Sequence, residues 1–124
     1  GAVWTCTTRG RLPREVAAAY LAPYDTWQSR IATLRFVQDI PLSPSDKAYG
    51  VVEATAEGLH LLADLPMQIH WGMQDFVFDA AFLAEWERRF PEAEVHRYDD
   101  AGHYILEDAA SEIVPRVVDF LGRT

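Results

Sequence analysis

The sequence predicts an α/β fold with parallel strands, and two short runs carry that prediction. Met67 to Gly72 and Ala93 to Tyr98 have the length and composition of buried strands, and a glycine stops the first. A helix-forming stretch lies between the two runs, and another follows the second. A strand, a crossover helix, a second strand and a helix make a βαβα unit, so we expect the two strands to be parallel neighbours.

Two strands are too few for a parallel sheet. Parallel sheets are buried on both faces in arrangements of several strands, whereas two strands alone leave both edges open. We therefore expect the chain to be the last part of a larger sheet whose other strands precede residue 1. Removing such strands exposes an edge and apolar helix faces, so the expected partner is a missing N-terminal half or a second copy of the chain.

The part of the chain before the first strand is predicted to be mainly helical. Residues 1–12 show no clear periodicity and predict an irregular start. Strong helix formers run from Arg14 to Leu21, and apolar residues at helical spacing indicate a second helix over residues 25–37 and a third over residues 45–62. The third helix is expected to turn four apolar side chains inward: Val51, Val52, Leu59 and Leu62.

The two helices that belong to the βαβα unit have clearer end signals. Asp79 is expected to cap the helix between the strands, and Pro91 closes it. The last helix is predicted to begin at Ala109 or Ser111, because Pro115 calls for a late start or a kink.

Composition and charge narrow the function. The chain has 124 residues, 49% of them hydrophobic, which suits one globular domain. Nineteen acidic against 11 basic side chains give a net charge of −8, which disfavours nucleic acid or an anionic membrane and favours a small neutral substrate. A single cysteine, Cys6, excludes an internal disulfide framework and indicates a reducing cytoplasm. No apolar run reaches the ~20 residues that span a bilayer.

Two residues stand where an α/β sheet collects its chemistry. Asp75 follows the first strand and His103 follows the second, and the carboxyl ends of parallel strands meet at one edge of the sheet. A carboxylate there can hold an imidazole in one tautomer and stabilise its protonated form. Asp75 and His103 are therefore the candidate catalytic acid and base.

The nucleophile that such a pair would serve is not found in these residues. An acid followed by a histidine is the chain order of the last two triad members in α/β-hydrolases. No Gly-x-Ser-x-Gly elbow occurs, nor the same elbow with Asp or Cys, and all four serines lie in helices or at helix caps: Ser29, Ser43, Ser45 and Ser111.

Several motifs together resemble one family. The stretch from Leu65 to Leu121 contains Trp-Gly-Met-Gln-Asp at residues 71–75 and Ala-Gly-His-Tyr at residues 101–104. It resembles the C-terminal part of the haloalkane dehalogenase and epoxide hydrolase branch of the α/β-hydrolases. Residues 21–24 and 30–41 are similar to the end of that family's helical cap. The β-lactone decarboxylase of bacterial olefin synthesis is a close relative, with a similar Trp-Gly-Met-x-Asp-Phe-Val-Phe run.

The resemblance implies an organisation and a mechanism. Residues 1–43 would be the end of the helical cap and its return to the core, and residues 44–124 the C-terminal part of the core. Asp75 matches the family's acid and His103 its base, which activates water against an ester formed on an aspartate nucleophile. Without a nucleophile, this chain alone should not turn over substrate. The family uses no cofactor.

The resemblance also implies a small apolar substrate. Four aromatic side chains are candidates for the wall of its pocket, with core packing as the alternative for each: Trp4, Trp27, Phe36 and Phe76.

Two other classes of function remain open on the residues alone. A metal site is conceivable from four side chains around the histidine, but the spacing of common zinc sites is absent: Asp99, Asp100, His103 and Glu107. Glu107 and Asp108 have a simpler expected role as acids at the start of the final helix. A non-catalytic interaction module built on the same half-sheet is the other alternative.

Overall fold

The structure is a computed structural model that describes residues 1–124, and its packing divides the chain into two units. Unit 1 consists of Gly1–Arg14 and Asp64–Thr124, and unit 2 of Glu15–Ala63. This division follows contacts within the chain. The predicted boundary between residues 43 and 44 follows family segments instead and stays a prediction.

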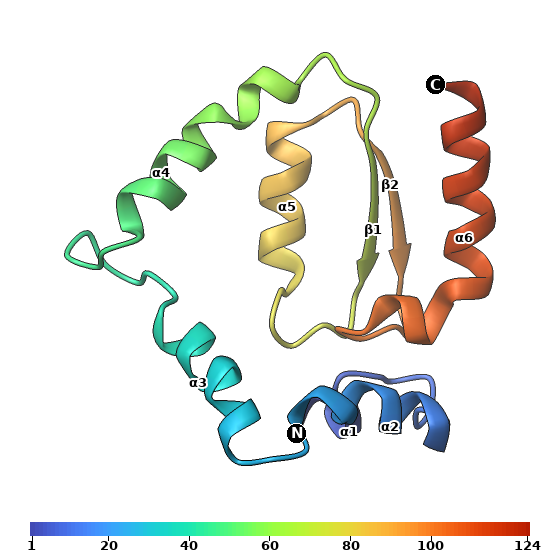
Figure 1. Cartoon of the computed structure of the whole chain (residues 1–124). Coiled ribbons are helices and arrows are strands. Elements are labelled where there is room, and N and C mark those ends of the chain that lie inside the picture. The colour runs from blue at the N-terminus through green and yellow to red at the C-terminus, as the bar shows by residue number, and fades with distance from the viewer. The chain divides into compact units, whose positions relative to one another are not determined.

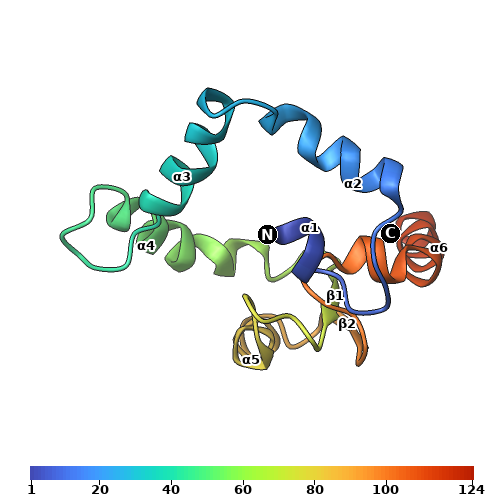
Figure 2. The same cartoon turned by 90° about the horizontal axis from the view of Figure 1, so that it is seen from below.

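Unit 1 contains the predicted parallel strand pair. Strand β1 (Gln68–Gly72) pairs in parallel with β2 (Glu94–Tyr98), in a register that joins Gln68 to Glu94 and Gly72 to Tyr98. Helix α5 (Ala80–Arg89) connects the strands, and α6 (Ile105–Arg123) follows β2. Figures 1 and 2 show α5 and α6 on opposite sides of the strand pair. The α/β class with parallel strands is confirmed.

Helix α5 begins and ends where its sequence signals predict. The Asp79 carboxylate accepts a hydrogen bond from the backbone N–H of Ala81 at 2.9 Å, which satisfies one of the free amides of the first turn. Leu83 and Phe90 are buried, whereas Arg88 remains exposed and pairs with Glu85. The helix is thus held by an N-cap and by one apolar stripe.

Helix α6 begins earlier than predicted. It starts at Ile105, but Ala109 interrupts it with non-helical angles (φ −132°, ψ 21°), so a first turn over residues 105–108 precedes a kink. The predicted start lies at this kink. The kink lets Ala109 and Ile113 pack with Tyr98 and Ala101 in the buried core of the unit. No helix of the chain is both long enough and apolar enough to cross a membrane.

The sheet face toward α6 is polar. His70 and His96 stack with ring centroids 5.0 Å apart, and the His70 ring also bonds to the Tyr98 hydroxyl through Nδ1 at 2.9 Å. Arg116 of α6 contacts His96, and Arg123 pairs with Glu94. Burial, together with the charge of His96, lowers the pKa of His70. These polar side chains hold α6 to the strands together with the apolar core around Tyr98 and Ile113.

The first residues of the chain are not irregular. They form a single helical turn, α1 (Ala2–Thr5), in which the Cys6 N–H donates to the Ala2 carbonyl at 3.0 Å. Val3 and Cys6 are buried, so the turn is stabilised by packing and not by a periodic pattern that a sequence reading could detect. The prediction of an irregular start is wrong for residues 2–5 and confirmed for residues 6–12.

Unit 2 contains helices and turns but no strand; its first helix has the predicted bounds, and the two later ones are shorter than predicted. It contains α2 (Arg14–Leu21) and the 3₁₀ turns Ala22–Tyr24 and Gln28–Arg30, followed by α3 (Ile31–Gln38), α4 (Tyr49–Gly58) and the 3₁₀ turn Leu59–Leu62. The side-chain oxygens of Thr26 and Ser29 each accept the backbone N–H of the other residue, a reciprocal cap for the 3₁₀ turn that leads into α3. Asp46 accepts from two preceding backbone amides, which keeps residues 42–46 in a turn.

The apolar side chains of α4 do not face inward. Val51 is 69% exposed and Val52 53% exposed, although their helical spacing is as expected. Ala17 is the only buried residue of unit 2, so the unit provides no second apolar layer to cover them. The inward orientation predicted for this helix is wrong within the unit.

We predict that Gly72→Ala destabilises unit 1 by roughly 1–3 kcal/mol, the usual cost of an added group in a filled site. A Cβ at residue 72 would lie 2.5 Å from the Gly102 carbonyl oxygen and 2.6 Å from that of Ala101, and backbone atoms cannot move aside cheaply. Urea-induced unfolding followed by circular dichroism measures the loss.

Gly122→Ala is the matched control for this prediction. Gly122 lies in α6 of the same unit, and a Cβ there would have nothing within 4 Å. We expect this variant to be neutral or slightly stabilising, because alanine is the better helix former by about 1 kcal/mol. Equal stability of Gly72→Ala and the unchanged protein would contradict the close packing of the two turns.

Candidate active site

Asp75 and His103 lie on two turns that are bonded to each other. Residues 73–75 leave β1 and residues 99–104, here called the histidine turn, leave β2. The Met73 N–H donates to the Tyr98 carbonyl and the Gln74 N–H to the Ala101 carbonyl, both at 2.9 Å. The Gln74 side chain also donates to the Asp99 carbonyl at 2.9 Å. The strand register therefore continues into the turns and brings the two candidate residues together.

The structure joins the acid and the base directly. The His103 Nδ1 lies 2.9 Å from one Asp75 carboxylate oxygen and 3.1 Å from the other. The Asp75 side chain is 11% exposed and that of His103 27%, so the contact is partly shielded from water while the imidazole keeps an open side. This is the pairing that the strand-end positions predicted.

Backbone amides fix the Asp75 carboxylate. One of its oxygens accepts from the Val77 N–H at 2.7 Å and from the Phe78 N–H at 3.0 Å. Burial by itself would raise the pKa of the Asp75 carboxyl, but the hydrogen bonds from His103 and from these two amides outweigh it and lower the pKa below its usual value. Asp75 is therefore ionised at neutral pH.

The ionised acid selects one tautomer of the base. A carboxylate can only accept hydrogen bonds, so the His103 Nδ1 must carry the proton that it donates to Asp75. In the neutral ring the lone pair is then on Nε2, which forms no hydrogen bond within the chain. The pair can accept a proton at Nε2 and stabilise the imidazolium that results.

Aromatic rings surround the imidazole. The ring of Phe78 lies 5.7 Å from that of His103, the ring of Tyr104 6.0 Å and the ring of Phe76 6.3 Å. Phe76 is thus the one predicted pocket residue that the structure brings beside the pair, and it is 66% exposed. Phe78 was not predicted, although its place two residues after Phe76 in the same run was a usable signal.

The other three predicted pocket residues are not gathered at the pair. Trp4 lies in α1 of unit 1 and is 66% exposed, with no ring contact to His103. Trp27 and Phe36 belong to unit 2 and are 83% and 77% exposed. A shared pocket for these residues stays a prediction.

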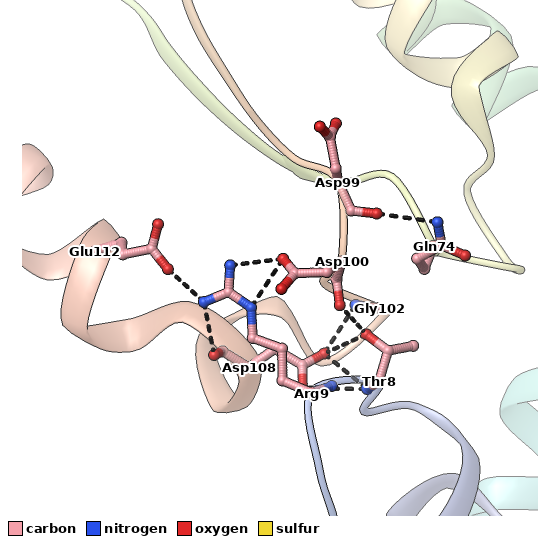
Figure 3. Close-up of polar contacts among 8 residues, drawn as sticks. All are labelled: Thr8, Arg9, Gln74, Asp99, Asp100, Gly102, Asp108 and Glu112. Carbon is pink, nitrogen blue, oxygen red and sulfur yellow. Dashed lines mark hydrogen bonds and ion pairs between the residues drawn. The ribbon is translucent and has the colours of Figure 1, made fainter.

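Asp108 does not act only as an acid at a helix start. It accepts hydrogen bonds from the backbone amides of Thr8, Arg9 and Gly102, as Figure 3 shows. Burial would raise the pKa of Asp108, but these amide bonds outweigh it and lower the pKa. Sequence reasoning missed this network because Thr8 and Asp108 are 100 residues apart and share no local pattern.

Two of the side chains proposed for a metal site have other partners. Asp100 pairs with Arg9 at 2.7 Å, and His103 pairs with Asp75. No group of three or more His, Cys, Asp or Glu residues in the chain is arranged to hold a metal ion.

Curated relatives share much of the sequence. The chain is 50% identical over 123 residues to the cis-3-alkyl-4-alkyloxetan-2-one decarboxylase of Xanthomonas campestris, and 47% identical over 116 residues to the protein of that name from Shewanella oneidensis. These matches cover 99% and 94% of the chain. The chain spans 41% and 36% of the length of the two relatives. No protein-family model matches it.

Solved structures share the fold. A haloalkane dehalogenase from Bradyrhizobium elkani superimposes with a TM-score of 0.72 at 28% identity, covering 94% of this chain and 40% of the dehalogenase. A loop variant of such an enzyme from Bradyrhizobium elkanii gives a TM-score of 0.73 at 29% identity, with 39% of its length covered. The predicted fold is confirmed: the chain has the architecture of a C-terminal portion of the α/β-hydrolase fold.

We predict that Asp75→Asn lowers the free energy of unfolding at about pH 7 by roughly 1–3 kcal/mol, as expected for hydrogen bonds to a charged acceptor. The pKa of Asp75 is lower in the folded than in the unfolded chain, so its contribution is complete above the unfolded value near ~4 and is lost as the pH falls through the folded value. The difference in unfolding free energy between the two proteins should therefore narrow in acid, as denaturation across the acidic range would measure.

Asp99→Asn is the control, because it removes the same charge from an exposed position whose carboxylate points away from the neighbouring polar network in Figure 3. It should leave both stability and its pH dependence nearly unchanged. A difference between Asp75→Asn and the unchanged protein that stayed constant with pH would contradict an ionised, bonded Asp75.

Proposed function

We propose that this chain, with the fold of a C-terminal portion of the α/β-hydrolases, carries the acid and the base of an oxetan-2-one decarboxylase. Asp75 is the acid and His103 the base of a triad whose nucleophile lies outside these residues. The observation that carries the role of the pair is the 2.9 Å contact between the Asp75 carboxylate and the His103 Nδ1 at the carboxyl ends of the two strands.

The relatives support the substrate class. Among the alternatives of the branch, haloalkane dehalogenase, epoxide hydrolase and β-lactone decarboxylase, the decarboxylases match at 47–50% identity and a dehalogenase structure at 28%. A ring with two alkyl substituents is an apolar substrate. The exposed rings of Phe76 and Phe78 beside His103 are suited to contact such chains.

The reaction sets a specific demand on this site. Decarboxylation of an oxetan-2-one breaks the bond between C2 and C3 and the bond between C4 and the ring oxygen, and it leaves an alkene and carbon dioxide. No water is consumed, whereas halide displacement followed by ester hydrolysis consumes one. We therefore expect His103 to form a hydrogen bond to the reacting groups of the substrate and to stabilise the charge that develops on them. We also expect the site to exclude water from these groups.

The chain by itself is proposed to be inactive. It contains no nucleophile elbow, and a pair of acid and base lacks the group that would form a covalent intermediate. The alternative of a non-catalytic interaction module has no observation in its favour beyond the same half-sheet.

We expect the isolated chain to self-associate or to bind a complementary segment. Its sheet has two strands, and large apolar side chains are exposed on several helices. Light scattering should show species heavier than one chain, and adding a complementary segment of a relative should reduce them. A stable monodisperse monomer would contradict this expectation.

We predict that this chain can replace the matching segment of the Xanthomonas campestris decarboxylase with retention of activity, since the two are 50% identical over 123 residues. In that hybrid, His103→Gln should lower the rate by at least about a hundredfold, the usual effect of losing a general acid or base. Alkene, 3-hydroxy acid and halide are measured from oxetan-2-one and haloalkane substrates, so the products identify which reaction occurs.

His60→Gln serves as the matched control, because His60 is an exposed histidine whose ring bonds to the backbone carbonyl of Glu57, at the end of α4. It should leave the hybrid's rate unchanged. Full activity of the His103→Gln hybrid would overturn the proposed role of the pair. Halide release without alkene would overturn the substrate class and leave that role standing.

A further inference from the structure

The backbone on both sides of His103 is hydrogen-bonded, on one side to the start of the chain and on the other to the Asp108 side chain. The Tyr104 N–H, directly after the histidine, donates to the Cys6 carbonyl at 2.8 Å. The Gly102 N–H, directly before it, donates to the Asp108 carboxylate at 2.8 Å. The peptide group that follows His103 and the N–H of the residue before it are thus both bonded, and neither bond comes from β1 or from the Asp75 turn.

Asp108 links the histidine turn to residues 8 and 9. Its two carboxylate oxygens accept from the Thr8 N–H at 3.0 and 3.1 Å and from the Arg9 N–H at 3.1 Å, and the Thr8 hydroxyl lies 3.2 Å from one of them. The carboxylate therefore has donors from two segments of the chain. The Asp108 side chain thereby joins residues 8 and 9 to the histidine turn, as Figure 3 shows.

The approach at this point is close. A Cβ at Gly102 would lie 2.8 Å from the Cys6 carbonyl oxygen and 3.0 Å from the Thr8 methyl group. The histidine turn is thus pressed against residues 6–8 with no space for a side chain at residue 102. A loosely docked start of the chain would not produce this packing.

The Arg9 side chain adds further bonds to this network. Its guanidinium pairs with Asp100 at 2.7 Å and with Glu112 and donates to the Asp108 carbonyl at 3.3 Å. The Thr8 hydroxyl donates to the Asp100 carbonyl. Asp100 within the histidine turn and Asp108 and Glu112 after it are thereby connected to two neighbouring residues, Thr8 and Arg9.

We propose that Asp108, held by Thr8 and Arg9, is a positioning residue that keeps the His103 imidazole aligned with Asp75. The inference rests on the proposed function for its catalytic meaning, but the alignment itself is a property of the folded chain. Met73 and Gln74 bond to the turn from the side of Asp75, and Asp108 together with Cys6 bonds to it from the opposite side. Without the bonds from Asp108 and Cys6, the His103 imidazole can rotate away from the Asp75 carboxylate.

Nitrogen NMR of the labelled chain at a pH where His103 is neutral tests the proposal. The ¹⁵N shifts of its ring report the ratio of the Nδ1–H to the Nε2–H tautomer, and Asp75 favours the former. In Asp108→Asn we expect that ratio to fall roughly fivefold, the factor that one ordinary hydrogen bond corresponds to. Asp99→Asn, with the same loss of charge in the histidine turn, should keep the ratio of the unchanged protein.

The remaining amide resonances report whether a variant is folded. An unchanged ratio in folded Asp108→Asn would overturn the proposal. If that variant does not fold, Thr8→Val decides the matter, because it removes only the hydroxyl bonds to Asp100 and Asp108 at nearly equal size: a lower ratio supports the proposal and an unchanged one overturns it. The measurement needs no turnover, so its outcome is independent of whether the hybrid decarboxylates its substrate.

Discussion

The close contact between the two turns at the carboxyl ends of the strands is the constraint on which the rest of unit 1 depends. Gly72 ends β1 against the carbonyl groups of Ala101 and Gly102, where a Cβ would have no space. This approach allows the backbone bonds between the turns and brings Asp75 within 2.9 Å of His103. The positions of Asp75, His103 and the core around Ala101 all depend on this one contact, in which the backbone of one turn packs directly on the backbone of the other.

Carboxylates bonded to backbone amides recur around this contact. Asp75 accepts from the two amides that follow it, Asp79 caps α5, and Asp108 accepts from amides of both the first segment and the histidine turn. An ionised acceptor is favoured where several N–H groups converge, and each such carboxylate fixes the direction of a turn. Part of the net negative charge therefore has a structural role at the site.

Features that depend on residues close together in the sequence could be predicted, whereas features that depend on contacts between distant residues could not. Both strands, the cap at Asp79 and the Asp75–His103 pair could be predicted, because period, end signals and strand-end position are local features. The turn of α1 and the exposure of Val51 could not, because each depends on which apolar surface is available in the folded chain.

The sequence by itself determined the parallel pair of strands and the pairing of Asp75 with His103, since residue order along a βαβα unit already places both at one edge. Only the tertiary structure decided what holds the base. Thr8 and Asp108 are 100 residues apart, and no periodicity relates positions so distant. Their contact exists because the docked start of the chain presents free backbone amides to a carboxylate beside the histidine turn, and convergence of that kind arises only in the folded chain.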